Sequence, residues 1–265
     1  MTPGGLLVIT AHPDDEAIIA GGVLAATAAA GVATSVVCLT RGELGGVSDP
    51  QLLAGRTLAQ ARRDELHEAC DALGVRSVRC LRRADGYLPF VRRGELVAQI
   101  ARLVRAERPA AVLTFGEDGL YYHPDHVAVH ELTRAAMERL WQEDDADPGA
   151  PVLYEAVWPS RVTVAAAQAL ARRDLPCELW GIPPEDFGVD ELTGAVRIEV
   201  RAFVAAKLRA LRCHRTQIGP DHLFARLPAA LARRYLAHEW FRPRAPAHAD
   251  TGWLSRTATA GVPRG

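Results

Sequence analysis

The feature that most constrains the fold is a regular alternation of short apolar runs with longer helical patterns through the first half of the chain. Runs that are apolar throughout are typical of parallel strands covered on both faces, and longer segments of helical periodicity indicate helices. The alternation therefore predicts an α/β fold: a Rossmann-like, open and mostly parallel sheet with helices on both faces. The expected strands are 6–10, 34–40, 77–81 and 110–115, and the expected helices are 17–30, 57–73, 95–106 and 126–141.

The second half of the chain is patterned more weakly. Strands are expected at 152–157 and 196–200, and helices at 164–173 and 203–213. An acidic stretch with Pro and Gly at 143–151 is expected to join the two halves. We expect residues 1–150 to form the Rossmann-like core and residues 151–242 to complete the sheet and the cleft of the same domain. Residues 243–265, rich in Pro, Ala, Thr and Gly and without periodicity, are expected to form a flexible tail.

Charge, cysteine content and hydropathy exclude several functional classes. The net charge of −1 leaves no excess positive field for nucleic acid or anionic lipid. The five cysteines are scattered and never spaced C-x-x-C, which argues against a disulfide framework or a thiolate zinc cluster and favours a reduced, cytoplasmic protein. Segment 17–40 is uncharged and long enough to cross a bilayer, but its Ala, Gly and Thr content favours a buried helix and strand. We therefore expect no membrane span and no nucleic-acid partner, and the chain is compatible with a homo-oligomer.

Two polar clusters follow the first and the fourth expected strands. In open parallel sheets, ligands bind beyond the carboxyl ends of the strands, near the point where the strand order reverses. The first strand runs into T-A-H-P-D-D-E at 10–16, and the fourth is followed by Y-Y-H-P-D-H at 121–126. The first loop has three carboxylates where a dinucleotide loop needs glycines, so it would repel a phosphate and attract a cation. The two loops are therefore expected to face each other across a metal site.

The side chains of these loops fit a catalytic zinc site, which needs three protein ligands and one open position. His12 and Asp15 can converge from one tight loop, and His126 can arrive from the other. We expect one Zn²⁺ per chain, although two imidazoles and a carboxylate also suit Fe²⁺. His130 is the rival ligand because it lies one helical turn beyond His126 on the same face. A solvated or core position is the favoured interpretation of His130.

The remaining polar residues of the two loops suit the hydrolysis of an amide. Asp14 cannot easily bind the same metal from the same loop, but it can reach metal-bound water and act as the general base. His123 is free of the metal if His126 binds it, and Asp125 is close enough to hold its imidazolium. A cation at that place would stabilise an oxyanion and could protonate a leaving amine.

These two motifs resemble those of the LmbE/PIG-L family of zinc-dependent N-deacetylases. The resemblance rests on A-H-P-D-D-E at 11–16 and H-P-D-H at 123–126, each after its strand, and is strong over 6–140 and weak beyond. It implies the same roles as the residues themselves: zinc ligands His12, Asp15 and His126, general base Asp14, and an electrostatic or acid partner His123 oriented by Asp125.

The resemblance also implies functions for residues outside the two loops. Arg62 and Asp85 would contact the sugar, and Tyr121 would shift toward the reacting carbonyl. Each has an ordinary structural alternative, since an Arg and a Glu three apart on a helix usually form a surface ion pair and Asp-Gly is typical of a turn. His214, in H-R-T-Q at 214–217, resembles a family histidine, but a structural or rim position is favoured over metal binding.

Together these observations predict a cytoplasmic, metal-dependent hydrolase that removes the N-acetyl group from an N-acetylated amino sugar, such as an N-acetylglucosamine glycoside. The motifs predict the bond, whereas the sugar is implied by the resemblance to enzymes of mycothiol-like and bacillithiol-like pathways. Two alternatives stay open: hydrolysis of a non-sugar amide or a phosphoester, and a non-catalytic sugar-binding module with a structural metal. Phosphoester enzymes commonly use two ions, so the number of metal ions per chain distinguishes phosphoester hydrolysis from the predicted deacetylation. The sequence does not predict the aglycone.

Overall fold

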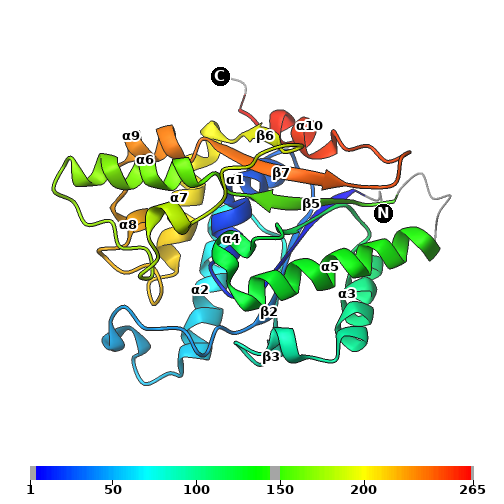
Figure 1. Cartoon of the computed structure of the whole chain (residues 1–265), viewed down its shortest axis with the longest axis horizontal. Helices are drawn as coiled ribbons and strands as arrows, with labels where there is room; N and C mark the ends of the chain where they lie inside the picture. The colour runs from blue at the N-terminus through cyan, green and yellow to red at the C-terminus, as the bar shows by residue number, and fades with distance from the viewer. Residues whose placement is uncertain (1–3, 144–149, 264–265) are drawn as a thin grey trace.

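The computed structural model describes residues 4–143 and 150–263 (Figure 1). Within these residues the strands form one seven-stranded sheet in the order β3-β2-β1-β4-β5-β7-β6. Strands β1 to β5 are parallel, whereas β7 runs antiparallel to both β5 and β6. The predicted mostly parallel α/β fold is confirmed. The strands are β1 (Gly5–Thr10), β2 (Thr34–Thr40), β3 (Ser77–Arg83), β4 (Pro109–Phe115), β5 (Val152–Val157), β6 (Val196–Glu199) and β7 (His238–Arg244).

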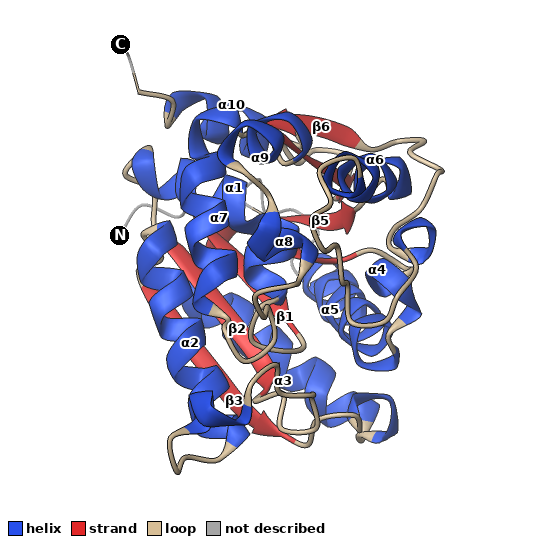
Figure 2. Cartoon of the chain, turned by 90° about the vertical axis from the view of Figure 1, so that its left-hand side faces the viewer, coloured by secondary structure: helices blue, strands red, loops and turns tan. Residues whose placement is uncertain are grey.

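Helices cover both faces of this sheet. Helices α1, α2 and α7 pack against one another on one face, and α3 and α5 pack together on the other (Figure 2). The uncharged segment 17–40 forms most of α1 and all of β2, and no described helix is long and apolar enough to span a bilayer. The helices are α1 (Asp15–Ala29), α2 (Leu58–Leu73), α3 (Arg93–Glu107), α4 (Gly119–Tyr122), α5 (Pro124–Glu143), α6 (Ser160–Ala171), α7 (Val204–Cys213), α8 (Leu223–Arg226), α9 (Ala229–Tyr235) and α10 (Trp253–Ala260).

The strand order reverses at β1, which lies between β2 and β4. Because β1 and β4 are parallel, their carboxyl ends at Thr10 and Phe115 meet at the same edge of the sheet. The loop after β1 leads into α1, and the chain after β4 passes through α4 into α5. This is the crevice at which open α/β sheets bind ligands, so the topology brings both polar clusters to one place.

The described part of the C-terminal segment, 243–263, is not the flexible tail that its composition predicts for 243–265. Its first two residues extend β7, and α10 packs against α1 with Leu254 and Ala258 fully buried. The phenolic oxygen of Tyr154 bonds the backbone at both Thr251 and Leu254. The prediction was wrong because α10 is short and gains its stability from α1, at the other end of the chain. The expected joint at 143–151 lies largely outside the described residues.

Candidate active site

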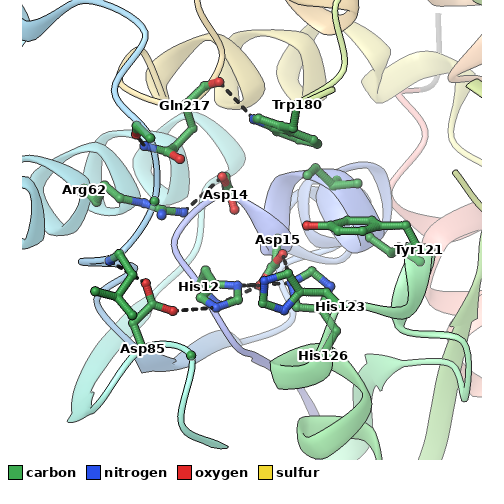
Figure 3. Close-up of a pocket in the computed structure, with 16 residues that line it drawn as sticks. His12, Asp14, Asp15, Arg62, Asp85, Tyr121, His123, His126, Trp180 and Gln217 are labelled. Atoms are coloured by element: carbon green, nitrogen blue, oxygen red, sulfur yellow. Dashed lines mark hydrogen bonds and ion pairs between the residues drawn. The ribbon is translucent and has the colours of Figure 1, made fainter. Parts of the chain in front are cut away.

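A cavity of about 240 Å³ opens at the carboxyl ends of β1 and β4 (Figure 3). Its walls come from the loops after β1, β2 and β3, from α2, from the α4 segment and from the chain at Trp180 and Gln217. Every predicted site residue except Asp125 lines this cavity, and Asp125 is buried behind it. The lining members of that set are His12, Asp14, Asp15, Arg62, Asp85, Tyr121, His123 and His126.

The three predicted metal ligands converge on one point of this cavity. His12 Nδ1 lies 3.1 Å from His126 Nε2. Asp15 Oδ1 lies 3.2 Å from His126 Nε2, and Asp15 Oδ2 lies 3.6 Å from His12 Nδ1. The donor atoms of His12, His123 and His126 also lie within 4.8 Å of one another, which keeps His123 within reach of the same point. The structure therefore brings the predicted ligand set together from two loops that are far apart in the chain.

The outward-facing nitrogens of the two histidines are already occupied. His126 Nδ1 lies 3.0 Å from the carbonyl oxygen of Gly119. His12 Nε2 lies 2.9 Å from an Asp85 oxygen and 3.3 Å from an Asp125 oxygen. Metal-binding histidines have this arrangement, in which one nitrogen faces the ion and the other donates to a carbonyl or a carboxylate. The donor set consequently fits a divalent cation such as Zn²⁺, which favours imidazole and carboxylate ligands.

The side chains of this cluster perturb one another's charge. Burial opposes the charged form of His12, but hydrogen bonds to Asp125 and Asp85, with the charge of Asp15, outweigh it and raise its pKa to about 10. Burial raises the pKa of Asp15 to about 8, although the charge of His12 lowers it. Burial and the charge of His12 lower the pKa of His123 to about 4. A metal ion must therefore displace a proton from His12 and, below about pH 8, one from Asp15 on binding.

Asp14 is held in a conformation that few residues other than glycine adopt. Its φ of 118° lies in the region that costs a side-chain-bearing residue strain. The backbone N–H donates to Glu16 Oε2 at 3.0 Å, and the carbonyl oxygen accepts the amides of Ala17 and Ile18 at the start of α1. Burial raises the pKa of Asp14, and the Arg62 guanidinium opposes this shift. Such strain concentrates at functional sites, which agrees with the predicted role of Asp14 as the base.

Arg62 does not form the surface ion pair with Glu65 that helical spacing permits. It is 4% exposed, and its guanidinium donates to the carbonyl oxygens of Pro13 at 2.7 Å and Gly42 at 2.9 Å. The same group reaches Asp14 Oδ2 at 3.2 Å. Glu65 instead accepts two hydrogen bonds from Thr216. Arg62 thus clamps the loop after β1, and its predicted sugar contact stays a prediction.

The Asp125 carboxylate does not contact the His123 imidazole as predicted. This carboxylate accepts the backbone N–H groups of Gly86 at 2.8 Å and Leu88 at 3.1 Å, and it faces His12 Nε2. It is the backbone N–H of Asp125 that donates to His123 Nδ1, at 3.2 Å. The carboxylate therefore orients a predicted metal ligand and the loop after β3. The sequence places Asp125 next to both histidines but does not indicate which one its carboxylate faces.

One further residue that contacts the site, Glu16, was not assigned a role from the sequence. Glu16 is buried behind the loop after β1, where its second oxygen, Oε1, lies 2.8 Å from His214 Nε2. His214 therefore has the structural position favoured for it, and through Glu16 it supports the backbone of Asp14. His130 does not line the cavity, and its Nδ1 lies 3.0 Å from the carbonyl oxygen of Phe115. A 198-residue separation between His214 and Glu16 explains why no sequence pattern indicates their contact.

Comparison with known proteins agrees with this geometry. A family model described as PIG-L, GlcNAc-PI de-N-acetylase, matches residues 7–137. A 1D-myo-inositol 2-acetamido-2-deoxy-alpha-D-glucopyranoside deacetylase from Thermobispora bispora is 31% identical over 91% of this chain and 88% of that protein. A protein of the same name from Actinosynnema mirum is 36% identical over 82% of this chain and 81% of its own length.

Among solved structures, the N,N'-diacetylchitobiose deacetylase from Pyrococcus horikoshii shares 25% sequence identity with this chain at a TM-score of 0.61. The match covers 91% of this chain and 84% of that one. The same family is indicated by the fold, by the positions of the two motifs and by relatives that match most of the chain. The chain therefore belongs to the PIG-L family of de-N-acetylases.

Proposed function

We propose that this protein is a metal-dependent hydrolase that removes the N-acetyl group from an N-acetylated amino sugar, such as an N-acetylglucosamine glycoside, and releases acetate. The observation that supports it most strongly is the convergence of His12, Asp15 and His126 in a cavity that Asp14 also lines. The named relatives support the sugar, since each is a deacetylase of an acetamido-glucopyranoside. The proposed metal is one Zn²⁺, with Fe²⁺ as the alternative.

A divalent cation at this point would supply Lewis-acid polarisation and water of lowered pKa. Asp14 takes the proton of the attacking water, and the Arg62 guanidinium at 3.2 Å fixes the orientation of its carboxylate. The same proton can then pass from Asp14 to the leaving amine. The proton therefore needs no other acceptor in the site.

His123 serves as a neutral hydrogen-bond donor in this scheme. Its Nδ1 accepts the backbone N–H of Asp125, so the proton of the neutral imidazole is on Nε2. Burial lowers the pKa of His123, which favours this neutral form over the imidazolium. An N–H directed at the reacting carbonyl stabilises the oxyanion that develops there.

The test is an acetate-release assay of the zinc-loaded protein on a panel of N-acetylglucosamine glycosides, with the free amine measured in parallel. We expect turnover by the wild type and a loss of about 10²-fold to 10⁴-fold in Asp14→Asn, because general-base catalysis contributes that much. The metal content of Asp14→Asn should equal that of the wild type. Asp64→Asn, at a half-buried position outside the cavity lining, is the matched control and should keep full activity. Release of acetate from no member of the panel would overturn the sugar assignment.

Two wider features accompany this proposal. We propose that 1–150 and 151–242 act as one catalytic unit, since β5, β6 and β7 continue the sheet of β1 to β4. We also propose a cytoplasmic location, because the five cysteines, all among the described residues, are free thiols. Limited proteolysis would test the single catalytic unit, and redox-sensitive labelling in cells would test the cytoplasmic location.

A further inference from the structure

Four large apolar side chains are exposed on segments that also contribute residues to the cavity lining. Leu44, Tyr87, Phe90 and Tyr122 are 67%, 58%, 80% and 72% exposed. Among the described residues the only other exposed large apolar side chain is Val262, at 44%. Single exposed apolar residues are ordinary, whereas a cluster of them marks a binding surface. We call these four residues the apolar rim.

The apolar rim is continuous with the lining of the cavity. Leu44 is itself a lining residue, and a Cβ atom placed on Gly86 would lie 3.1 Å from Leu44 Cδ1. Tyr87 follows Gly86 directly, and its ring centroid lies 6.3 Å from that of Phe90. Tyr122 follows Tyr121, which Figure 3 places on the side of the histidines opposite Asp85. The segments that carry the rim therefore reach the cavity on two sides of the histidines.

The loop that carries Tyr87 and Phe90 is fixed by the site itself. The Asp125 carboxylate accepts the backbone amides of Gly86 and Leu88, and the Leu88 side chain is buried. The two rings are thus held outward by a backbone that is anchored on both sides of Tyr87. A preorganised apolar surface binds a partner without the cost of ordering a loop.

The size of the cavity determines which part of a substrate meets this rim. A volume of about 240 Å³ is below the roughly 300–1,000 Å³ of pockets that enclose a drug-sized ligand. A sugar ring with its acetamido group can enter, so the group attached to the sugar must lie at the mouth. A polyol there, such as the inositol in the names of the relatives, would leave the rim without an apolar partner.

We propose that the group attached to the acetamido sugar is apolar, an alkyl or aryl aglycone that packs on Leu44, Tyr87, Phe90 and Tyr122. This proposal rests on the proposed deacetylation and specifies its substrate class. Burial of apolar surface on the rim lowers the free energy of the bound substrate and of the transition state together, so it raises kcat/KM.

The experiment compares two N-acetylglucosamine glycosides of the same anomeric configuration, one with a methyl and one with an octyl aglycone. We expect kcat/KM to be at least about tenfold higher for the octyl glycoside, because burying even two or three methylenes gives that factor. Phe90→Ser and Tyr87→Ser should each lower the octyl-to-methyl ratio toward one. Val262→Ser removes an exposed apolar side chain outside the cavity lining and should leave the ratio unchanged.

The outcomes separate this proposal from the proposed function. Deacetylation of both glycosides at equal kcat/KM would overturn the apolar aglycone and leave the deacetylase intact. If neither glycoside is deacetylated, calorimetric affinities of both for Asp14→Asn still test the rim, and equal affinities would overturn it. Rim variants that weaken binding to phosphatidylcholine vesicles while the octyl-to-methyl ratio stays unchanged would assign the surface to a bilayer instead.

Discussion

Lys207, the single lysine of the chain, forms an ion pair with Glu239 inside the protein. Their side chains are 1% and 2% exposed, and Lys207 Nζ lies 2.6 Å from Glu239 Oε1. Nζ also donates to the carbonyl oxygen of Ile18 at 2.8 Å, and the Glu239 carboxylate accepts the N–H groups of Gly22 and Val23. In a regular helix the Ile18 carbonyl and the Gly22 amide would bond each other. The pair therefore binds backbone groups of α1 at Ile18, Gly22 and Val23.

Replacing Lys207 with Met tests how much this buried pair stabilises the fold. Met retains most of the apolar stem, so the main effect is a buried Glu239 carboxylate without its cation and an Ile18 carbonyl without its donor. Removing one partner of a buried ion pair costs about 3–5 kcal/mol, and we expect a loss of that size in the free energy of unfolding. The double variant Lys207→Met/Glu239→Gln removes the uncompensated charge and should be about 2 kcal/mol more stable than the single variant.

The assay is urea denaturation followed by circular dichroism, with the slope of the transition checked for two-state behaviour. Arg209→Met is the matched control, because Arg209 is an exposed base on the same helix, and its effect should stay within about 0.5 kcal/mol. A loss below about 1 kcal/mol in Lys207→Met, or a double variant no more stable than the single one, would refute this reasoning.

The remaining predictions concern the site, the C-terminal helix and pH. Arg62→Lys should lower kcat/KM about tenfold to hundredfold at unchanged metal content, since an ammonium cannot hold three acceptors in the guanidinium geometry; wild-type kinetics would contradict the clamp. Leu254→Ala should lower the free energy of unfolding by about 2–5 kcal/mol, because the side chain is fully buried, whereas a flexible tail would show no effect. Chelation should remove the proposed activity, and added Zn²⁺ should restore it; activity that persists in a protein shown to be free of metal would exclude a catalytic ion. Burial lowers the pKa of His222 to about 3. Below about pH 6.5 the unfolded state therefore binds a proton at this residue that the folded state does not. The free energy of unfolding should consequently fall toward pH 3 by up to about 1.4 kcal/mol per pH unit. His222→Gln should have a shallower loss of stability between about pH 6.5 and 4.5, and an equal slope in urea titrations of both proteins would disprove that linkage.

The parallel half of the fold could be predicted because β1, β2 and β4 are apolar and buried on both faces and are separated by segments of helical periodicity. Strand β7 was missed because its pattern is broken by Glu239, Arg242 and Pro243. Distant partners explain the first two, and the position along the strand explains Pro243. Glu239 faces α1 and Arg242 bonds the carbonyl oxygens of Glu191 and Thr193. Pro243 lies beyond the residues of β7 that pair with β6. Such tertiary contacts permit polar residues that break the alternation of apolar and polar side chains expected of a strand.

The convergence of the predicted ligands could be foreseen because His12 and Asp15 share one short loop. The loop that carries His126 follows a parallel strand, and the carboxyl ends of parallel strands meet at one edge of the sheet. The contacts that support these ligands are not local. Gly21 and Gly22, which the sequence leaves without a function, lie where Lys207 and Val200 approach α1, and a Cβ on Gly22 would lie 2.5 Å from Val200 Cγ2. The direction of the Asp125 carboxylate likewise depends on the loop after β3, whose backbone amides it accepts. Side-chain orientation at the site is therefore determined by segments that no single motif contains.

The most direct test of this account is the position of the metal in a crystal of the zinc-loaded protein, located by anomalous diffraction at the zinc edge. We predict one ion per chain, bound by His12 Nδ1, His126 Nε2 and an Asp15 oxygen at about 2.0–2.2 Å. An ion held instead by Asp85 and Asp125 with His12, or one closed by His123 as a fourth protein ligand, would contradict it.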